Sequence, residues 1–334
     1  MRLLKEIQSH IPLVPRPFLE IAKRINAREE EVIRSLRTMK EEGIVRQISP
    51  IYDTKAAGYD SALIAFKVSG ERLKEAVALI NSHPGVSHNY EREHDFNLWF
   101  TLAVPPDSEL GLEGTVNLIA RLSGAEEHLI LRVVRTFKIG VKLDYEKISE
   151  REKPRVLEEK RVSELSPFEK EVIKITQEDI PLTPRPFRDV GELLGVGEEE
   201  VLETLRALKD KGIMRRFSAI FFHRKVGFVA NGMAVWKVPK EKVADVGLYL
   251  ASLKSVSHCY ERTTVGRWNY NLFSMIHGRC RDEVLELVEK IGDELGIREK
   301  KVLFSRSEFK KRRVRLFSED FYEWEERYGR IHLN

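Results

Sequence analysis

The chain contains two copies of one unit, and this internal duplication constrains its fold more than any other feature. The sequence IPLVPRPF, from Ile11 to Phe18, returns 169 residues later as IPLTPRPF, with seven of eight positions identical. The sequence VSHNYER, starting at Val86, returns 170 residues later as VSHCYER, starting at Val256. Ordered matches at nearly constant spacing indicate duplication. The fold must therefore be one that the chain forms twice.

Each copy begins with three predicted helices. A short helix precedes the proline-rich turn, and a second helix begins near Phe18 or Phe187. A third is predicted over 29–42 and again over 198–211, each followed by a glycine that ends it. This order predicts a helix-turn-helix module of the winged-helix-like kind.

Each helical module is followed by alternating strand and helix patterns. In the first copy the expected elements are a strand (61–68), a helix (71–81), two strands (86–92 and 97–104), a helix (108–122) and a strand (129–137). This βαββαβ order predicts a ferredoxin-like domain and places the chain in the α+β class.

The duplication and its charged middle segment divide the chain into five expected parts. They are a helix-turn-helix module (1–58), a ferredoxin-like domain (59–146), a charged linker (147–165), a second helix-turn-helix module (166–227) and a second ferredoxin-like domain with a C-terminal extension (228–334). The second copy opens with Ser166, Pro167 and Glu169, the residues of a capped helix start.

Composition excludes several classes of protein. The only cysteines are Cys259 and Cys280, so the sequence argues against a disulfide framework or a cysteine-based metal site. No apolar run approaches the roughly 20 residues of a membrane helix, and the N-terminus lacks a signal-peptide pattern. We therefore expect a cytoplasmic protein that does not bind a membrane.

The third helices carry too little positive charge for a DNA reader. Residues 28–42 hold five acidic and four basic side chains, and residues 198–211 hold five and three. A helix that enters the major groove needs a basic surface toward the phosphates. DNA binding is therefore not expected, and the helical modules are expected to serve packing or to shape a pocket.

The repeated strand motif places polar side chains in a row. Alternate residues of a strand share a face, so Val86, His88, Tyr90 and Arg92 are expected together, and the second copy repeats this row. The repeated residues are Val256, His258, Tyr260 and Arg262. Helices cover only one face of a ferredoxin-like sheet, so the row is expected on the uncovered face, available to a ligand or to the other copy.

The two copies differ beside this row. Asn271, Phe273, Met275 and His277 are expected on one face of the second copy, whereas the first has Ala103 in the place of His277. The preceding loop is Glu93-His94-Asp95 in the first copy and a longer segment with Arg267 and Trp268 in the second. These differences favour one asymmetric site over two equal ones.

The predicted architecture resembles the feast/famine transcription regulators. Within it, the proline-rich turns, the His-x-Tyr-Glu-Arg strands and the stretches 97–101 and 270–278 resemble siroheme decarboxylases over nearly the whole chain. That family uses two related subunits, and each copy here resembles one of them. The resemblance implies removal of carbon dioxide from two acetate side chains of siroheme, giving didecarboxysiroheme on the way to haem or to d-type haem.

The resemblance assigns chemistry to the candidate residues. Siroheme is an iron macrocycle with eight carboxylates, which calls for apolar walls, basic side chains and acid catalysis. The expected catalytic residues are His88, His94, His258 and His277, one of which is also a candidate ligand of the substrate iron. The expected substrate-binding residues are Tyr90, Arg92, Trp99, Tyr260, Arg262, Trp268, Asn271 and Lys310. No cofactor and no dedicated metal site are expected, because the macrocycle itself accepts the electron pair.

Several alternatives remain open from the sequence. His94 also suits a hairpin turn, and the prolines suit the corner between helices, although Arg16 and Arg185 beside them are candidate carboxylate ligands. The basic run 310–315 also suits an exposed strand end. Alternative functions are a transcription regulator and a tetrapyrrole sensor or carrier. An internal pseudo-dimer is expected, and two chains are expected to form a homodimer.

Overall fold

The proline-rich turns start helices in both copies, because proline is well suited to the first position of a helix.

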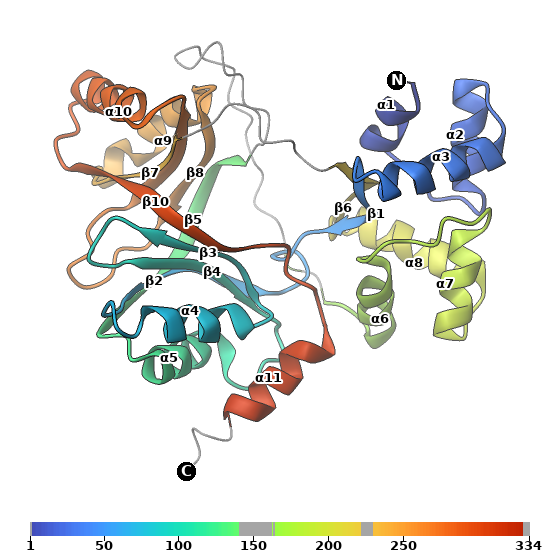
Figure 1. Cartoon of the computed structure of the whole chain (residues 1–334), viewed down its shortest axis with the longest axis horizontal. Helices are drawn as coiled ribbons and strands as arrows, with labels where there is room; N and C mark the ends of the chain where they lie inside the picture. The colour runs from blue at the N-terminus through green and yellow to red at the C-terminus, as the bar shows by residue number, and fades with distance from the viewer. Residues whose placement is uncertain (1, 140–161, 163, 222–229, 330–334) are drawn as a thin grey trace. The chain divides into compact units, whose positions relative to one another are not determined.

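The computed structural model describes residues 2–139, 162, 164–221 and 230–329, so most of the predicted linker lies outside the described residues. Contacts among the residues divide the chain into two units (Figure 1). The helical unit comprises 1–59, 160–224 and 315–322, and the strand unit comprises the remainder.

The helical unit contains both helix-turn-helix modules. The elements of the first copy are α1 (Arg2–Ser9), α2 (Pro17–Ile25), α3 (Glu29–Glu41) and β1 (Val45–Tyr52). Those of the second are α6 (Pro167–Thr176), α7 (Pro186–Leu194), α8 (Glu198–Asp210) and β6 (Met214–Phe221). Strands β1 and β6 pair antiparallel and join the modules. The predicted capping box is present, with Ser166 accepting from the Glu169 amide and the Glu169 carboxylate accepting from the Ser166 amide.

Arginines of the two third helices bind the opposite module. Arg37 of α3 donates to the Leu182 carbonyl at 2.7 Å, and Arg206 of α8 donates to the Leu13 carbonyl at 3.2 Å. Both carbonyls belong to the proline-rich turns. Two basic groups that a DNA reader would turn toward phosphate are thus used to join the modules, in line with the packing role expected from the sequence.

The strand unit contains the two ferredoxin-like domains. The first comprises β2 (Asp60–Lys67), α4 (Leu73–Ser82), β3 (Val86–Arg92), β4 (Leu98–Val104), α5 (Gly111–Ser123) and β5 (Glu127–Ile139). The second comprises β7 (Ala230–Trp236), the 3-10 turn η1 (Lys240–Lys242), α9 (Val243–Ser252), β8 (Val256–Arg262), β9 (Leu272–Gly278), α10 (Arg281–Leu295) and β10 (Lys300–Lys311). The predicted βαββαβ order is confirmed in both copies.

The two sheets join edge to edge into one closed barrel. Its strand order is β10-β3-β4-β2-β5-β8-β9-β7, in which β5 pairs with β8 and β10 pairs with both β3 and β7. The two domains thereby pair through their sheets. Helices α4 and α5 lie on the outer face of the first sheet, and α9 and α10 lie on that of the second (Figure 1). The uncovered faces of both sheets therefore line the inside of the barrel.

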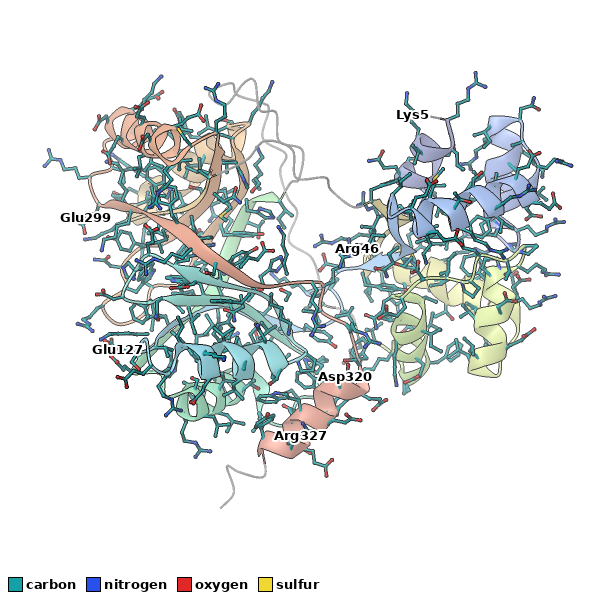
Figure 2. The ribbon with its side chains drawn as sticks, in the orientation of Figure 1. Lys5, Arg46, Glu127, Glu299, Asp320 and Arg327 are labelled. Carbon is teal, nitrogen blue, oxygen red and sulfur yellow. The ribbon has the colours of Figure 1, made fainter. Side chains whose placement is uncertain are left out.

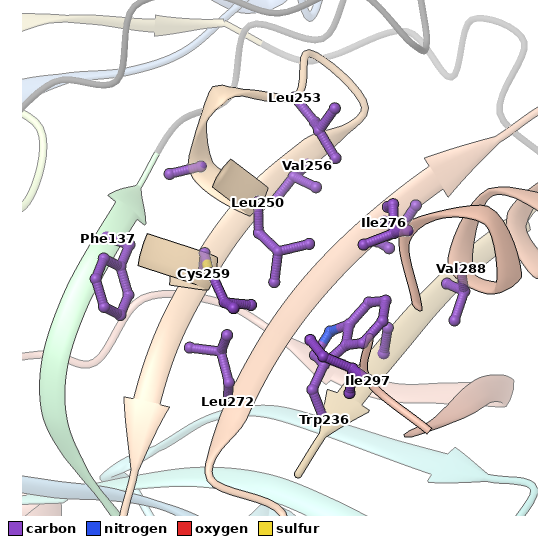
Figure 3. Close-up of a cluster of buried hydrophobic side chains, with 14 of the residues drawn as sticks. Phe137, Trp236, Leu250, Leu253, Val256, Cys259, Leu272, Ile276, Val288 and Ile297 are labelled. Carbon is purple, nitrogen blue, oxygen red and sulfur yellow. The ribbon is translucent and has the colours of Figure 1, made fainter. Parts of the chain in front are cut away.

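Separate apolar cores fill the two sides of the second sheet. Trp236, Leu250, Cys259 and Ile276 belong to the core between the sheet and its helices (Figure 3). A second core holds residues of both sheets and is called here the barrel-interior cluster. Its members are Ala65, Trp99, Leu129, Leu131, Met233, Val235, Trp268, Phe273 and Leu303.

A C-terminal helix, α11 (Glu319–Gly329), packs on the first domain and was not predicted from the sequence. The Trp324 indole lies edge-on to the His83 ring at 4.3 Å between centroids and donates to the Ser82 hydroxyl at 3.0 Å. The Glu325 carboxylate accepts from the Ser108 hydroxyl and from two amides at the start of α5, whose partial positive charge it complements. The second domain has no counterpart of this helix among the described residues.

None of the described helices combines the length and the apolar character needed to cross a membrane. The described part of the chain also contains no group of three or more His, Cys, Asp or Glu side chains arranged to hold a metal ion.

Candidate active site in the strand barrel

The histidine, tyrosine and arginine of each repeated motif lie in a row, as the sequence predicts. Ring centroids of His88 and Tyr90 are 6.3 Å apart, and the Arg92 guanidinium lies 5.4 Å from the Tyr90 ring. The second copy repeats the row, with 6.1 Å between His258 and Tyr260 and 5.0 Å between Tyr260 and the Arg262 guanidinium. Arg262 also lies 5.7 Å from the ring of Phe273, a member of the barrel-interior cluster, so the row faces inward.

The valine that opens each motif does not belong to this row, which corrects the sequence prediction. A β-bulge lies between Val86 and His88, and another lies between Val256 and His258. The extra residue reverses the alternation of faces. Val256 therefore packs in the helix-side core together with Cys259, while His258 faces the other side.

The two arginines of the rows are buried, and no carboxylate among the described residues pairs with them. Arg92 is 4% exposed and Arg262 is 8% exposed. Each donates from Nη1 to a backbone carbonyl at 2.9 Å, Arg92 to Leu303 and Arg262 to Leu131, and each Nε has no hydrogen-bond partner among the described residues. Burial lowers the pKa of both guanidinium groups to about 10, and they still carry full charge at neutral pH. Two uncompensated positive charges therefore face the barrel interior.

Aromatic side chains gather beside these arginines. Trp268 lies 5.3 Å from Trp99 and 6.3 Å from Phe273 between ring centroids. The Trp268 indole nitrogen is buried and has no hydrogen-bond partner among the described residues. The His94 ring lies 5.6 Å from Trp268, while its Nδ1 accepts from the Phe96 amide at 3.1 Å. The structure thus brings the two tryptophans together and places His94 in the hairpin turn beside them.

The longer loop of the second copy carries Trp268 into this cluster. Gly266 has a φ of +55°, a left-handed conformation that lets Val265 and Trp268 pair across a tight turn. Arg267 donates to both carboxylate oxygens of Glu127 at 2.8 Å. The side chain of Glu127 is labelled in Figure 2. The loop of the second copy is therefore bound to β5 of the first copy. Only the second copy supplies an indole from this loop.

His258 and His277 are connected through a serine. The Ser257 hydroxyl lies 2.9 Å from Nδ1 of His258 and 2.7 Å from Nε2 of His277. Nδ1 of His277 lies 2.7 Å from Oδ1 of Asn231 on β7. These contacts form one continuous hydrogen-bonded chain through four side chains of the second copy.

The first copy has a shorter series of hydrogen-bonded side chains at the equivalent place. The Ser87 hydroxyl lies 2.9 Å from Nδ1 of His88 and 2.6 Å from the Thr101 hydroxyl. Lys311 pairs with His88 across β10 and β3, where Ile139 pairs with His258 across β5 and β8. The two rows therefore differ in charge as well as in hydrogen bonding.

The four candidate histidines are less basic than an exposed histidine. Burial lowers the pKa of His88, His94 and His258, with further lowering from Lys311, Lys301 and His88 respectively. Burial, His258 and Lys311 lower the pKa of His277 to about 4. Desolvation thus disfavours the imidazolium form of these side chains in the ligand-free chain.

Two predicted substrate-binding residues hold the fold together. The Lys310 ammonium donates to the Asn81 carbonyl at 2.7 Å and the His83 carbonyl at 2.9 Å, at the end of α4, and burial lowers its pKa to about 8. The Asn271 amide accepts from the Val238 amide and donates to the Val238 carbonyl, and this residue precedes β9 instead of lying in it.

The arginines of the proline-rich turns are also engaged within their modules. Arg16 is paired with Glu29 and Arg185 with Glu198, each at the start of the following third helix. These contacts support the structural reading of the turns.

Sequence reasoning missed three polar residues beside the rows. Ser257 and Asn231 belong to the histidine chain, and Glu308 accepts from the Tyr90 hydroxyl at 3.2 Å. Burial and Glu308 raise the pKa of Tyr90 to about 12. Ser257 stands inside the repeated Val-Ser-His motif, so the duplication itself was the available signal. Asn231 and Glu308 come from distant strands that no sequence pattern links to the motif.

Two protein-family models match the chain, each of them twice. The model of the AsnC-like ligand binding domain matches residues 56–138 and 225–310. The model of the siroheme decarboxylase NirDL-like HTH domain matches residues 1–46 and 169–215.

Curated proteins and solved structures match over nearly the whole length. A siroheme decarboxylase of Hydrogenobacter thermophilus is 49% identical over 97% of this chain and 96% of its own. A siroheme decarboxylase NirDL subunit of Paracoccus pantotrophus is 38% identical over 86% of this chain and 87% of its own. A crystal structure of the siroheme decarboxylase NirDL in co-complex with an iron-uroporphyrin III analogue has a TM-score of 0.83 at 42% identity, covering 99% of this chain and 98% of that one.

Proposed function

The chain belongs to the siroheme decarboxylase family, and on that premise we propose how its barrel performs the reaction. It is a siroheme decarboxylase, a carboxy-lyase. We propose that it removes carbon dioxide from two acetate side chains to give didecarboxysiroheme, for haem or d-type haem synthesis. The iron arrives with the substrate, and no further cofactor takes part.

The observation that carries this proposal is the pair of buried, uncompensated arginines. Arg92 and Arg262 each keep a guanidinium Nε without a partner in the described barrel. A carboxylate of the substrate supplies the missing acceptor, and a charge-assisted hydrogen bond is strongest where water is excluded. Trp99, Trp268 and Phe273 form the apolar surroundings that a flat macrocycle requires. Tyr90 and Tyr260 stand between each arginine and its histidine and orient the substrate edge.

Each decarboxylation consumes one proton. Protonation of a pyrrole carbon makes the ring an electron sink, the bond between the acetate methylene and its carboxylate breaks, and the electron pair moves into the ring as carbon dioxide leaves. A proton added to the exocyclic methylene gives the methyl group, and the ring carbon returns its own proton. The donors and acceptors are the inward-facing histidines His88 and His258, with His277 connected to the latter. His94 is proposed to contact the ring from the hairpin turn.

Binding of the substrate activates the histidines. In the ligand-free chain, burial and nearby positive charge keep them neutral. Carboxylates brought close to them favour the imidazolium, since an opposite charge raises a histidine pKa. Proton uptake therefore accompanies substrate binding, and the acid is formed only when there is a substrate to protonate.

We further propose that the two copies form one asymmetric site in a cytoplasmic enzyme. The hydrogen-bonded chain with His277, the Trp268 loop and Lys311 each occur on one side only. The cysteines Cys259 and Cys280 are both free thiols, as is usual in a reducing compartment.

Anaerobic incubation of the purified chain with siroheme tests the proposal. Mass spectrometry should detect a product lighter by two carbon dioxide units. A matched pair of variants, Arg92→Met and Arg262→Met, should weaken siroheme binding, measured by the shift of its absorption band. If the chain is folded and binds siroheme but leaves it unchanged, a carrier function would be favoured instead. If both arginine variants kept full siroheme binding and full turnover, Arg92 and Arg262 would not belong to the site.

A further inference from the structure

Four side chains of the second copy are joined end to end by short hydrogen bonds, from Asn231 through His277 and Ser257 to His258. We propose that Asn231, His277 and Ser257 fix which ring nitrogen of His258 carries its proton, and so act as positioning residues. The part of this inference that concerns catalysis rests on the proposed function of His258. The part that concerns the proton position does not.

The donor and acceptor of each hydrogen bond in this series follow from Asn231, the first acceptor. The Oδ1 of Asn231 is an amide oxygen, which only accepts, so Nδ1 of His277 at 2.7 Å carries a hydrogen. A neutral His277 then has a bare Nε2, and the ring is neutral because burial, His258 and Lys311 lower its pKa to about 4. The Ser257 hydroxyl must donate to that nitrogen across 2.7 Å.

The same reasoning continues to the last residue. The hydroxyl hydrogen of Ser257 is used toward His277, so its oxygen accepts from Nδ1 of His258 at 2.9 Å. A neutral histidine with hydrogen on Nδ1 has an unprotonated Nε2. In the ligand-free chain His258 therefore presents a lone pair on Nε2, and this is the nitrogen that takes up a proton when the substrate binds.

The first copy lacks the group that sets this direction. His88 contacts Ser87, and Ser87 contacts the Thr101 hydroxyl, which both donates and accepts. Asn231 and His277 pair across β7 and β9, and the equivalent pair across β2 and β4 is Ser61 and Ala103. Among the described residues no side-chain amide or second imidazole is hydrogen-bonded to the Ser87 or Thr101 hydroxyl, so this pair leaves His88 able to carry its proton on Nε2 and act as the donor.

The proton position can be read directly by NMR of the full chain labelled with ¹⁵N-histidine. Long-range ¹H–¹⁵N correlations distinguish protonated from unprotonated ring nitrogens, and His258→Gln and His277→Gln assign the signals. The wild type should show hydrogen on Nδ1 of His258 and a bare Nε2. Ser257→Ala and Asn231→Leu should convert His258 to a mixture of both forms, and Ser257→Thr should restore the wild-type pattern.

The matched control is Ser87→Ala in the first copy, which should leave the His258 signals unchanged. The inference would be overturned if wild-type His258 carried its hydrogen on Nε2. It would also be overturned if the His258 signals were the same in Ser257→Ala and Asn231→Leu as in the wild type. These outcomes are readable without substrate, so they are independent of whether the chain decarboxylates siroheme.

Turnover of siroheme tests the part of the inference that concerns catalysis by His258. Loss of the partner that orients a metal-bound histidine typically costs about 10- to 100-fold in activity, and we take the same range for His258. We expect that loss in kcat for Ser257→Ala, with little change in KM and recovery in Ser257→Thr. An unchanged kcat in a variant whose His258 signals have changed would separate the proton position from catalysis and contradict the positioning role.

Discussion

We predict that the charge of the buried arginines stabilises a bound substrate, whereas its burial destabilises the empty protein. Burial depresses the pKa of Arg262 to about 10, and at about 1.4 kcal/mol per pKa unit this disfavours the charged guanidinium by about 3 kcal/mol. Arg262→Met removes that cost and also removes the hydrogen bond to Leu131, which contributes about 1.5–3 kcal/mol because its donor is charged. The free energy of unfolding of the ligand-free chain should therefore stay the same or rise, by up to about 2 kcal/mol.

The same substitution should weaken siroheme binding. A hydrogen bond to a charged group contributes about 1.5–3 kcal/mol, which corresponds to a loss of affinity of about 10- to 100-fold. Urea unfolding measures the first effect and an anaerobic absorbance titration measures the second. Arg279→Met is the control, because Arg279 is exposed and paired with Glu283, and it should change neither. A less stable Arg262→Met chain with undiminished affinity would refute this reasoning.

Four further predictions follow from the geometry. His83 is fully buried, its Nδ1 accepts from the Gly85 amide, and burial and Lys310 lower its pKa to about 3. Its contribution to stability is complete above its unfolded pKa of about 6.5 and is lost as the pH falls toward 3. Urea unfolding should therefore show a loss of stability from pH 7 to pH 5 that is about 2 kcal/mol smaller in His83→Asn than in the wild type, because the other buried histidines contribute equally to both chains. Trp324→Ala should cost about 3–5 kcal/mol in the same assay, since the indole is 5% exposed. A thiol reagent should modify exposed Cys280 in the native chain and spare Cys259, whose pKa is raised by burial, as peptide mass mapping would show. Siroheme binding should take up protons, and calorimetry in buffers of different ionisation enthalpy would measure them.

The order of the elements could be predicted because each is encoded locally. The predicted bounds of the strand that begins at Val86 match β3, since alternation and flanking turns lie within the segment itself. The bulge after Val86 could not be predicted in this way, because it depends on the register with β4. It moved the valine to the helix side and left the histidine row facing inward.

The composition of the site was predictable only in part. His88, Tyr90 and Arg92 carry their signal in the duplicated motif, so they were identified together. Lys310 and Asn271 looked equally polar in the sequence, but backbone carbonyls and amides of distant segments engage them. Pairing with a remote strand likewise decides the role of Asn231, and no local pattern contains it.

The central claim is that the two copies form one siroheme-decarboxylating site. Anaerobic native mass spectrometry of the chain with excess siroheme tests it most directly, because it counts the bound tetrapyrroles and measures their mass. The account predicts one tetrapyrrole per chain, which becomes lighter by two carbon dioxide units with time. Two tetrapyrroles per chain, or one whose mass never changes, would contradict it.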